Sequence, residues 1–432
     1  MNKKKYPKKE ILKALIFVLP YIVVEFTNTV LIIIDRSISN SIGKTAIIVF
    51  SSFITLNWAI NTIQGCIASA HRIVLVRDKE NSKDINATGI AIELILGIIT
   101  SLFIYLFAEK ITYIYNLESD ARNILTIILK LKAIQLPFYS IGYIPGSDLQ
   151  INKKNRTLFI ITLITSFINI TGDLLSIKLG YNEVGIYVAT LISTLVSTIL
   201  LFIAFKFNIG KVSMKYVKEI IKYSKDLIFN KVIQRIVNIV YTRIASSFGT
   251  NIYAIHCACI TVSDTITEIA EGYYSGLLVI YSNDIENEEK ELINKVDTME
   301  VYGIMCSIFI SIVIIYPTWW LLGRAIPWKD CNPYIWLYAL EFVASVGTIN
   351  YQAYVSAKKD TKAIRNIALI GGICVRIPLV MIVKYANLGL IGLSVACGID
   401  RIIRTIYLRL YIRKKLIKEE TIVLNKKIEV KV

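Results

Sequence analysis

Some ionisable side chains lie inside stretches of the sequence that are otherwise apolar. Asn169 and Asp173 are four residues apart in the segment FINITGDLL, so on a helix they share one face. A carboxyl group buried away from water favours its protonated form, and it can therefore take up and release a proton near neutral pH. The pair predicts proton-coupled chemistry in an apolar setting.

The segment LPYIVVEFTNTVLIIID, residues 19–35, also carries polar residues through an apolar block. Glu25, Asn28 and Asp35 fall on roughly one face at helical spacing. An ionisable residue at membrane depth costs roughly 2.5–3.5 kcal/mol on insertion scales, so it tends to face the protein interior or a water-filled cavity. Asp35 has a simpler alternative, which is an exposed pair with Arg36 at the end of a helix.

Further polar stripes recur at helical spacing. Asn57, Asn61 and Gln64 form an amide stripe, which can hold two helices together or line a wet cavity. In the second half of the chain a basic stripe precedes an acidic one, and these either pair as structural salt bridges or line a cavity for a charged substrate. The two stripes comprise Lys231, Gln234, Arg235 and Asn238, and then Asp264, Glu268 and Glu271.

The elements that must position these side chains are twelve apolar blocks. The chain of 432 residues is 55% hydrophobic with a mean hydropathy of +0.57, which exceeds the usual composition of soluble domains. Each block has about 20 residues or more, enough to cross roughly 30 Å of hydrocarbon. The blocks predict an all-α polytopic membrane protein with twelve transmembrane helices, near residues 11–34, 45–73, 87–108, 122–149, 157–177, 185–206, 219–246, 251–281, 299–322, 332–356, 363–384 and 388–411.

The net charge of +17 lies mainly in alternate breaks between these blocks. This is the pattern of a cytoplasmic-membrane protein whose basic loops stay inside, and it predicts that both termini are cytoplasmic. The same distribution argues against a nucleic-acid partner. The expected partners are the lipid bilayer and a small-molecule substrate, with the protein as a monomer.

The two halves of the chain resemble each other. KKNR at 153–156 has a counterpart in KKDT at 358–361, and LGYNEVGIYVATLIS at 179–193 parallels VKYANLGLIGLSVACG at 383–398. A duplicated six-span unit predicts two pseudo-symmetric six-helix lobes around a central cavity. We expect an N-terminal lobe at 1–207, a cytoplasmic linker at 208–218, a C-terminal lobe at 219–412 and a basic cytoplasmic tail at 413–432.

The last two blocks carry charges as well. Arg376 lies near the repeat counterpart of Asp173, and it is a further cavity candidate. Asp400 and Arg404 are four residues apart and can satisfy each other.

The sequence offers no catalytic constellation. Histidine occurs only at His71 and His256, and no phosphate-binding GxxxxGK[ST] loop is present. We therefore expect no enzyme, no catalytic residue, no metal site and no cofactor other than a coupling ion, H⁺ or Na⁺.

Several motifs together resemble the multidrug and toxic compound extrusion (MATE) family of the flippase-like exporter superfamily. They are Pro20 followed by Asp35 and a turn at Gly43, the run ASAHRIVLVRDKEN at 68–81, and NITGD at 169–173 followed by LGYNEVGIYVATLIS. The resemblance implies a pair of six-helix lobes around a central cavity and a first span that bends at Pro20. It also implies a cation- or proton-coupling site made of Asp35, Asn169, Asp173 and Thr190.

The function implied by this resemblance is secondary antiport. An organic, amphipathic or cationic compound would leave the cell in exchange for H⁺ or Na⁺ as the two lobes rock. Lys231 and Arg235 stand where members of the family tend to be apolar or acidic. Two alternatives therefore stay open: a flippase for a lipid-linked or polyprenyl-phosphate substrate or a dedicated peptide or metabolite exporter of the same superfamily, and a non-transporting membrane partner or receptor on this fold.

Overall fold

The computed structural model describes residues 8–42, 44–113, 117–285, 289–322 and 326–429, and within these ranges the chain is helical with short connections. The helices are α1 (Lys8–Ile42), α2 (Lys44–Arg77), α3 (Ser82–Thr112), α4 (Ser119–Ile151), α5 (Asn155–Lys178), α6 (Asn182–Phe205), α7 (Met214–Ser246), α8 (Thr250–Asn283), α9 (Glu289–Leu322), α10 (Trp328–Ala357), α11 (Thr361–Ile367), the π-helical η1 (Ala368–Arg376), α12 (Ile377–Tyr385) and α13 (Gly389–Glu429).

Each of the twelve predicted spans lies within one helix, with at most one residue beyond its end, if α11, η1 and α12 are counted as one continuous stretch. The helices extend past the spans because charged residues at their ends reach beyond the apolar length. Within the described residues, six helical stretches are long and apolar enough to cross a membrane by length and composition alone. These are α3, α4, α5, α6, Glu291–Leu321 of α9, and Thr361–Tyr385. The all-helical, multi-pass fold is confirmed.

The chain forms two compact units, whose limits differ from the predicted lobes. The N-terminal unit is Pro20–Ile228, and the C-terminal unit is Met1–Leu19 together with Phe229–Val432. The chain therefore passes between units inside α1, next to Pro20, and again inside α7. The predicted bend position at Pro20 coincides with the first of these crossings.

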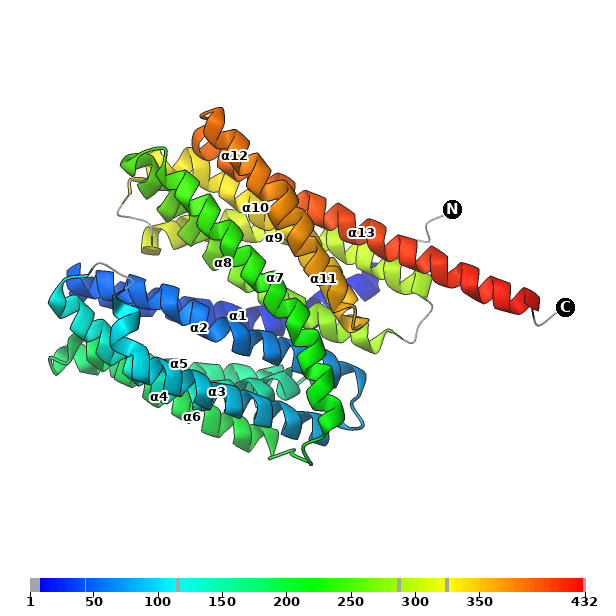
Figure 1. Ribbon diagram of the computed structural model, residues 1–432, viewed down its shortest axis with the longest axis horizontal. Helices are drawn as coiled ribbons and strands as arrows, with labels where there is room; N and C mark the ends of the chain where they lie inside the picture. Colours follow the sequence, from blue (N-terminus) through cyan, green and yellow to red (C-terminus); the bar gives the residue numbers. More distant parts are fainter. Residues whose placement is uncertain (1–7, 43, 114–116, 286–288, 323–325, 430–432) are drawn as a thin grey trace. The chain divides into compact units, whose positions relative to one another are not determined.

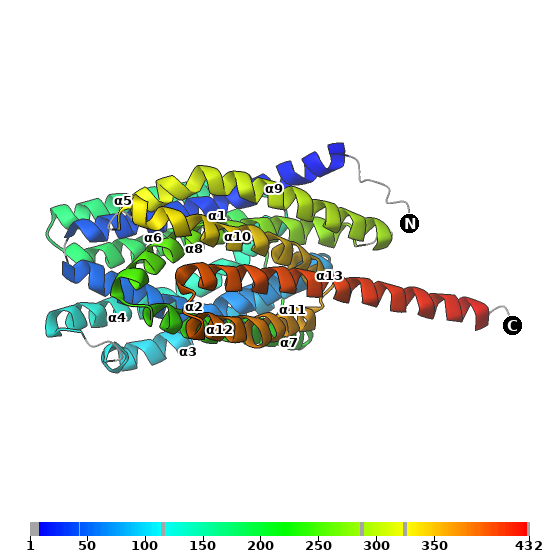
Figure 2. The same cartoon turned by 90° about the horizontal axis from the view of Figure 1, so that it is seen from above.

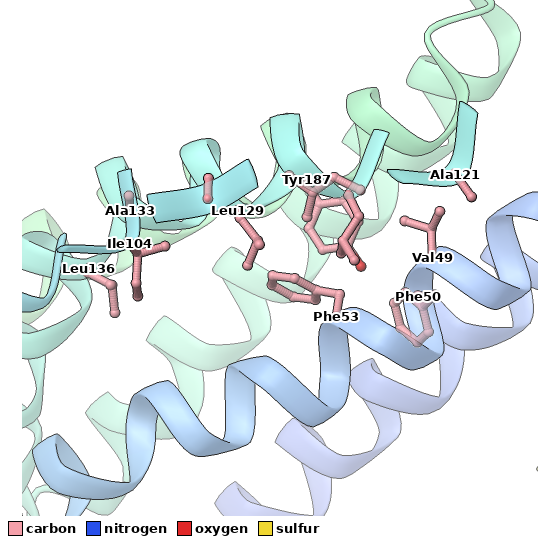
Figure 3. Close-up of a cluster of buried hydrophobic side chains, with 12 residues drawn as sticks. Val49, Phe50, Phe53, Ile104, Ala121, Leu129, Ala133, Leu136 and Tyr187 are labelled. Atoms are coloured by element: carbon pink, nitrogen blue, oxygen red, sulfur yellow. The ribbon is translucent and has the colours of Figure 1, made fainter. Parts of the chain in front are cut away.

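The N-terminal unit is built around α4, which packs against α3, α2 and α6 (Figure 1). Phe50 and Phe53 of α2 meet Tyr187 of α6, and the Phe53 and Tyr187 rings have centroids 4.5 Å apart. Figure 3 shows these rings beside Leu129 of α4, in a buried cluster that also draws on α3. Apolar burial of this kind, worth roughly 1.5–3 kcal/mol for a large side chain, holds the helices that carry the polar residues below.

In the C-terminal unit α10 packs against α8, α9 and α13, while α11, η1 and α12 run beside α13 (Figure 2). Gly371 and Gly372 in η1 permit close packing, since a Cβ on Gly371 would lie 2.4 Å from Asp400 Oδ1. The widened π-helical turn therefore lies directly against the charged residues of α13.

The predicted linker is held on the N-terminal unit by a series of hydrogen bonds. Gly210 N donates to Lys83 O at 2.9 Å, and Lys211 N donates to Asp84 Oδ1 at 2.9 Å. Ser213 N donates to Thr88 Oγ1 at 3.1 Å, and Tyr216 Oη to Asp78 Oδ2 at 2.8 Å. Residues 210–216, which we call the strap, are therefore fixed to the α2–α3 connection and the start of α3.

Candidate functional site

A cavity of about 660 Å³ lies within the N-terminal unit. Its walls come from α1, α2, α4, α5 and α6, and most of its polar side chains are amides and hydroxyls. Three charged residues line it: Glu25 of α1, Arg72 of α2 and Lys132 of α4. The size fits the range of small-molecule sites, which are mostly apolar with a few placed polar groups.

Lys132 is the most deeply buried of these charges, with 5% of its surface exposed. Its ammonium donates to Gln135 Oε1 at 2.9 Å and lies 4.5 Å from the centroid of the Tyr139 ring. Gln135 is oriented in turn, because its Nε2 donates to Thr194 Oγ1 of α6 at 2.6 Å. Among the described residues no carboxylate lies within 4.0 Å of Lys132, so none of its three N–H donors has an anionic partner.

The predicted amide stripe of α2 is divided between the cavity and the helix packing. Asn57 and Asn61 line the cavity, and Asn61 Nδ2 donates to Asn57 Oδ1 at 3.0 Å. Gln64 is not part of the cavity wall and is 1% exposed. Among the described residues neither its Oε1 nor its Nε2 has a hydrogen-bond partner.

The predicted Asn169–Asp173 pair is formed on α5. Asn169 Nδ2 donates to Asp173 Oδ2 at 3.2 Å, and Asp173 is fully buried. Ser193 of α6 donates to Asn169 Oδ1 at 3.0 Å. Thr190 lines the cavity near this pair, with its hydroxyl donating to Ile186 O of its own helix at 3.0 Å. The structure thus brings Asn169 and Asp173 together, with Ser193 linking them to α6.

Four predicted residues have side chains outside the described part of the structure. Asn28 and Asp35 lie on α1, and Asp264 and Glu268 lie on α8. Their helical positions are described, but their side-chain partners are not. Glu25, on the same helix as Asp35, lines the cavity and is half-buried.

The basic stripe of α7 belongs to the C-terminal unit and is largely accessible. Lys231 forms an ion pair with Glu271 of α8 at 3.8 Å, with both side chains exposed. Gln234 Nε2 donates to Asn230 Oδ1 at 3.3 Å, Arg235 is half-buried and Asn238 is exposed. Exposed pairs contribute about 0–1 kcal/mol, so this contact orients two helices more than it stabilises them.

Arg376 lies in a buried ion network at the end of η1. Its guanidinium is 3.5 Å from Glu341 of α10 and 3.9 Å from Asp400 of α13. It also stacks on Tyr241, with the guanidinium carbon 4.9 Å from the ring centroid. Arg404 donates to both oxygens of Asp400, at 2.7 and 3.0 Å, which confirms the predicted pairing of these two residues.

Several cavity residues were not identified from the sequence. Lys132, Gln135 and Tyr139 follow one another at i, i+3 and i+7 in an apolar block, so a helix presents them on one face. That spacing is the signal that could have revealed them. Arg72 lies among basic residues near a predicted cytoplasmic loop, where a cation is expected without any cavity.

In the described part of the chain, no three His, Cys, Asp or Glu side chains cluster closely enough to hold a metal ion. The site is instead a polar chamber with one buried cation, one half-buried carboxylate and a carboxyl–amide pair at its edge. Such a chamber offers charged and hydrogen-bonding groups beside an apolar wall, as small-molecule sites do.

Comparisons with known proteins agree with this architecture. Residues 60–300 match the family model described as "Polysaccharide biosynthesis protein". No curated protein matches the chain by sequence.

Solved structures of MATE transporters share the fold. An outward-facing multidrug resistance MATE transporter of the MOP superfamily is 14% identical, covers 93% of this chain and 95% of its own, and has a TM-score of 0.85. A eukaryotic MATE transporter is 14% identical, with coverages of 93% and 95% and a TM-score of 0.77.

A MOP superfamily transporter from Pyrococcus furiosus, described as having a binding pocket of reversed polarity that suggests a different function, is 13% identical. Its coverages are 93% and 95%, and its TM-score is 0.82. These likenesses confirm that the chain has the fold of MATE transporters.

Proposed function

This chain belongs to the polysaccharide biosynthesis protein family, and we propose that it is a secondary active transporter of an amphipathic molecule with an anionic polar end. A lipid-linked or polyprenyl-phosphate saccharide is the substrate class that the family description suggests. Transport proceeds across the cell membrane by rocking of two lobes, in exchange for H⁺ or Na⁺.

The observation that carries this proposal is the buried ammonium of Lys132 in the cavity wall. A buried cation is costly unless a charge of opposite sign accompanies it. Gln135 and Tyr139 hold the ammonium in place but supply no negative charge. A phosphate or carboxylate of the substrate supplies that charge, while the apolar part of the substrate lies on the aromatic and aliphatic wall.

The coupling part of the proposal rests on the Asn169–Asp173 pair. Asp173 is fully buried beside the cavity, with an amide donor at 3.2 Å. Protonation of a buried carboxylate removes its need for a charged or polar partner, so it changes the relative stability of two conformations. Proton binding at Asp173 is in this way linked to opening and closing of the N-terminal unit.

Ligand binding to purified protein tests the anionic substrate class. Farnesyl diphosphate should raise the thermal unfolding temperature of the wild-type protein, whereas farnesol, which has the same chain without phosphate, should not. Lys132→Met should bind farnesyl diphosphate roughly 10- to 100-fold more weakly, because charge-assisted hydrogen bonds contribute about 1.5–3 kcal/mol.

The matched control is Lys130→Met. Lys130 lies on the same helix, is exposed, and has its ammonium 5.8 Å from the ring centroid of Tyr105. This variant should bind farnesyl diphosphate as the wild type does. Equal losses in both variants would overturn the role of Lys132, since they would indicate a non-specific effect of charge.

A second candidate, export of an organic cation by antiport, is favoured by Glu25. This carboxylate lines the same cavity and could accompany a cationic substrate. This candidate is supported against the first if dodecyltrimethylammonium raises the thermal unfolding temperature of the wild type but not of Glu25→Gln. Farnesyl diphosphate should then leave the unfolding temperature of the wild type unchanged. Proteoliposomes that bind either ligand without moving it would instead indicate a receptor on this fold.

A further inference from the structure

Glu93 of α3 is a buried carboxyl group that the proposed function leaves without a role. It is fully buried, and among the described residues neither of its oxygens has a hydrogen-bond partner. α3 is an apolar membrane-spanning helix, and the neighbouring Leu94 and Ile95 are exposed on its outer face. An ionised carboxylate without a donor is unstable in such a place, so the group is protonated in this conformation.

The fold does not require an acid at this position. Gly97 of α3 packs against α4, where an added Cβ would lie 3.1 Å from Pro137 Cα, and an added Cβ on Gly303 of α9 would meet Tyr273 of α8 and Val346 of α10. The two glycines are 206 residues apart, which is the offset between α2 (Lys44–Arg77) and α8 (Thr250–Asn283) at both ends, so we take them as counterparts in the repeated halves. Four residues before them stand Glu93 and Met299, and both are fully buried. An apolar side chain thus fills the equivalent place in the C-terminal unit.

The groups around Glu93 leave its charge uncompensated. From α4, Tyr143 interacts electrostatically with Glu93 and also with Glu25, and it donates a hydrogen bond to Tyr139 at 2.9 Å. From α2, which also packs on α3, His71 is bound to Asn86 at 3.1 Å. Lys132 of α4 is engaged by Gln135. No described cation pairs with Glu93 within 4.0 Å.

A second polar group without a partner lies in the same layer of helices. Gln64 of α2 is almost fully buried, and neither its oxygen nor its nitrogen is hydrogen-bonded within the described structure. Buried polar groups are hydrogen-bonded in the great majority of cases, so two unsatisfied side chains on adjacent helices need an explanation. A conformation in which these helices shift and the two groups gain partners or water would provide one.

We propose that Glu93 binds and releases a proton during the transport cycle, as a coupling residue separate from the Asn169–Asp173 pair. In the conformation described here the carboxyl group holds the proton on one oxygen. When the helix layer opens to water, the O–H bond breaks, a water molecule accepts the proton and the carboxylate is solvated. Tyr143 of α4 lines the cavity and α4 packs on α3, so we assign this release to the cavity side.

This inference rests on the proposed transport function, but its first test does not depend on a substrate. Infrared difference spectra of the purified full-length protein in lipid nanodiscs, recorded between neutral and alkaline pH, should contain the carbonyl band of a protonated carboxylic acid, because ordinary carboxyl groups stay ionised over this range. Glu93→Gln should remove the component of that band that Asp173→Asn leaves in place. Glu300→Gln is the matched control, because Glu300 is a buried glutamate of α9 that accepts a hydrogen bond from Tyr351 at 2.8 Å. This control should keep the band.

The second test measures coupling in proteoliposomes loaded with farnesyl diphosphate. An imposed pH gradient should drive net movement of farnesyl diphosphate by the wild type. Glu93→Gln and Glu93→Met should still let farnesyl diphosphate move down its own concentration gradient, but the movement driven by the pH gradient should fall at least tenfold. The methionine variant reproduces the counterpart at Met299, so it should fold normally.

The outcomes separate the two proposals. A band that is unchanged in Glu93→Gln, or one that never changes with pH, would overturn the role of Glu93 even if transport is confirmed. Failure of the wild type to bind or move farnesyl diphosphate would contradict the proposed function, while the infrared test of Glu93 would still stand. Full gradient-driven movement of farnesyl diphosphate in Glu93→Met would show that Glu93 has no role in coupling and only fills space between helices.

Discussion

At the scale of single residues, the carboxyl–amide pair of α5 depends on a hydroxyl from α6. Ser193 donates to Asn169 Oδ1 at 3.0 Å, and Asn169 donates to Asp173. Ser193→Ala should therefore destabilise the protein by about 0.5–1.5 kcal/mol, because a buried acceptor loses its donor. Chemical denaturation of the purified protein in detergent measures this change.

Thr190→Val is the matched comparison for Ser193→Ala. The hydroxyl of Thr190 bonds to Ile186 O within its own helix, so its loss should change stability by less than about 0.5 kcal/mol. The MATE resemblance assigns the hydroxyl of the coupling site to Thr190, whereas the hydrogen bonds described here favour Ser193. A larger effect of Thr190→Val would reverse that preference.

Residue types alone could predict part of the site. The Asn169–Asp173 pair and the Asn57–Asn61 stripe were predictable because helical spacing dictates which side chains share a face. Lys132 and Glu93 were not, since a single charge in an apolar block can equally reach the membrane surface or a neighbouring loop. Only the packing of α4 against α3 and α6 buries these two groups.

At the scale of elements, the strap 210–216 shows how a connection and the first residues of the next helix can be fixed by hydrogen bonds to a neighbouring helix. A Cβ on Gly210 would lie 3.0 Å from backbone atoms of residues 83 and 84 and closer still to the Asp84 carboxylate. Gly210→Ala should therefore loosen the strap. Tryptic cleavage at Lys206, Lys211 and Lys215 should become roughly 5- to 30-fold faster, as expected for a local loss of about 1–2 kcal/mol.

Gly398→Ala is the control for this substitution. Gly398 lies in α13, where an added Cβ would meet no atom within 4 Å. Its cleavage pattern in the strap should equal that of the wild type. An unchanged cleavage rate in Gly210→Ala would mean that the strap tolerates the methyl group and that its hydrogen bonds do not limit access.

The contact between Asp78 and Tyr216 determines the pH range over which this end of the strap stays attached. Burial raises the pKa of Asp78, but hydrogen bonds from Asn81 and Tyr216 and the charge of Lys215 outweigh it, so the pKa lies below its ordinary value. Burial and the hydrogen bond to Asp78 raise the pKa of Tyr216 to about 12. The carboxylate contribution is lost only as pH falls through the lowered pKa, and the phenol contribution only as pH rises toward about 12. The strap is therefore insensitive to pH across the neutral range.

The helices themselves were predictable, and the unit limits were not. Apolar blocks of membrane length fix where each helix runs, because an unpaired backbone in lipid is too costly for any other structure. The predicted linker at 208–218 was located as the longest lysine-rich break between apolar blocks, where the chain divides into two halves. Those residues do not reveal that backbone N–H groups dock on Asp84 and Thr88, which attaches the linker and the start of α7 to the N-terminal unit.

At the scale of the whole molecule, the duplication predicts that equivalent connections of the two halves lie on the same side of the membrane. Tyr181, in the connection α5–α6, and Tyr385, the last residue of α12, should be external, while Lys154 and Lys362 should be cytoplasmic. All four side chains are exposed, so single cysteines there can react once the seven native cysteines are replaced.

A membrane-impermeant maleimide applied to intact cells should label Tyr181→Cys and Tyr385→Cys. The Lys154→Cys and Lys362→Cys variants should react only after the membrane is permeabilised. If each half contains six spans, the chain returns to the side of the membrane on which it started. Both halves then start on the same side, and the repeat is parallel. Labelling of one tyrosine position without the other would contradict the parallel repeat, and labelling of all four in intact cells would contradict cytoplasmic termini.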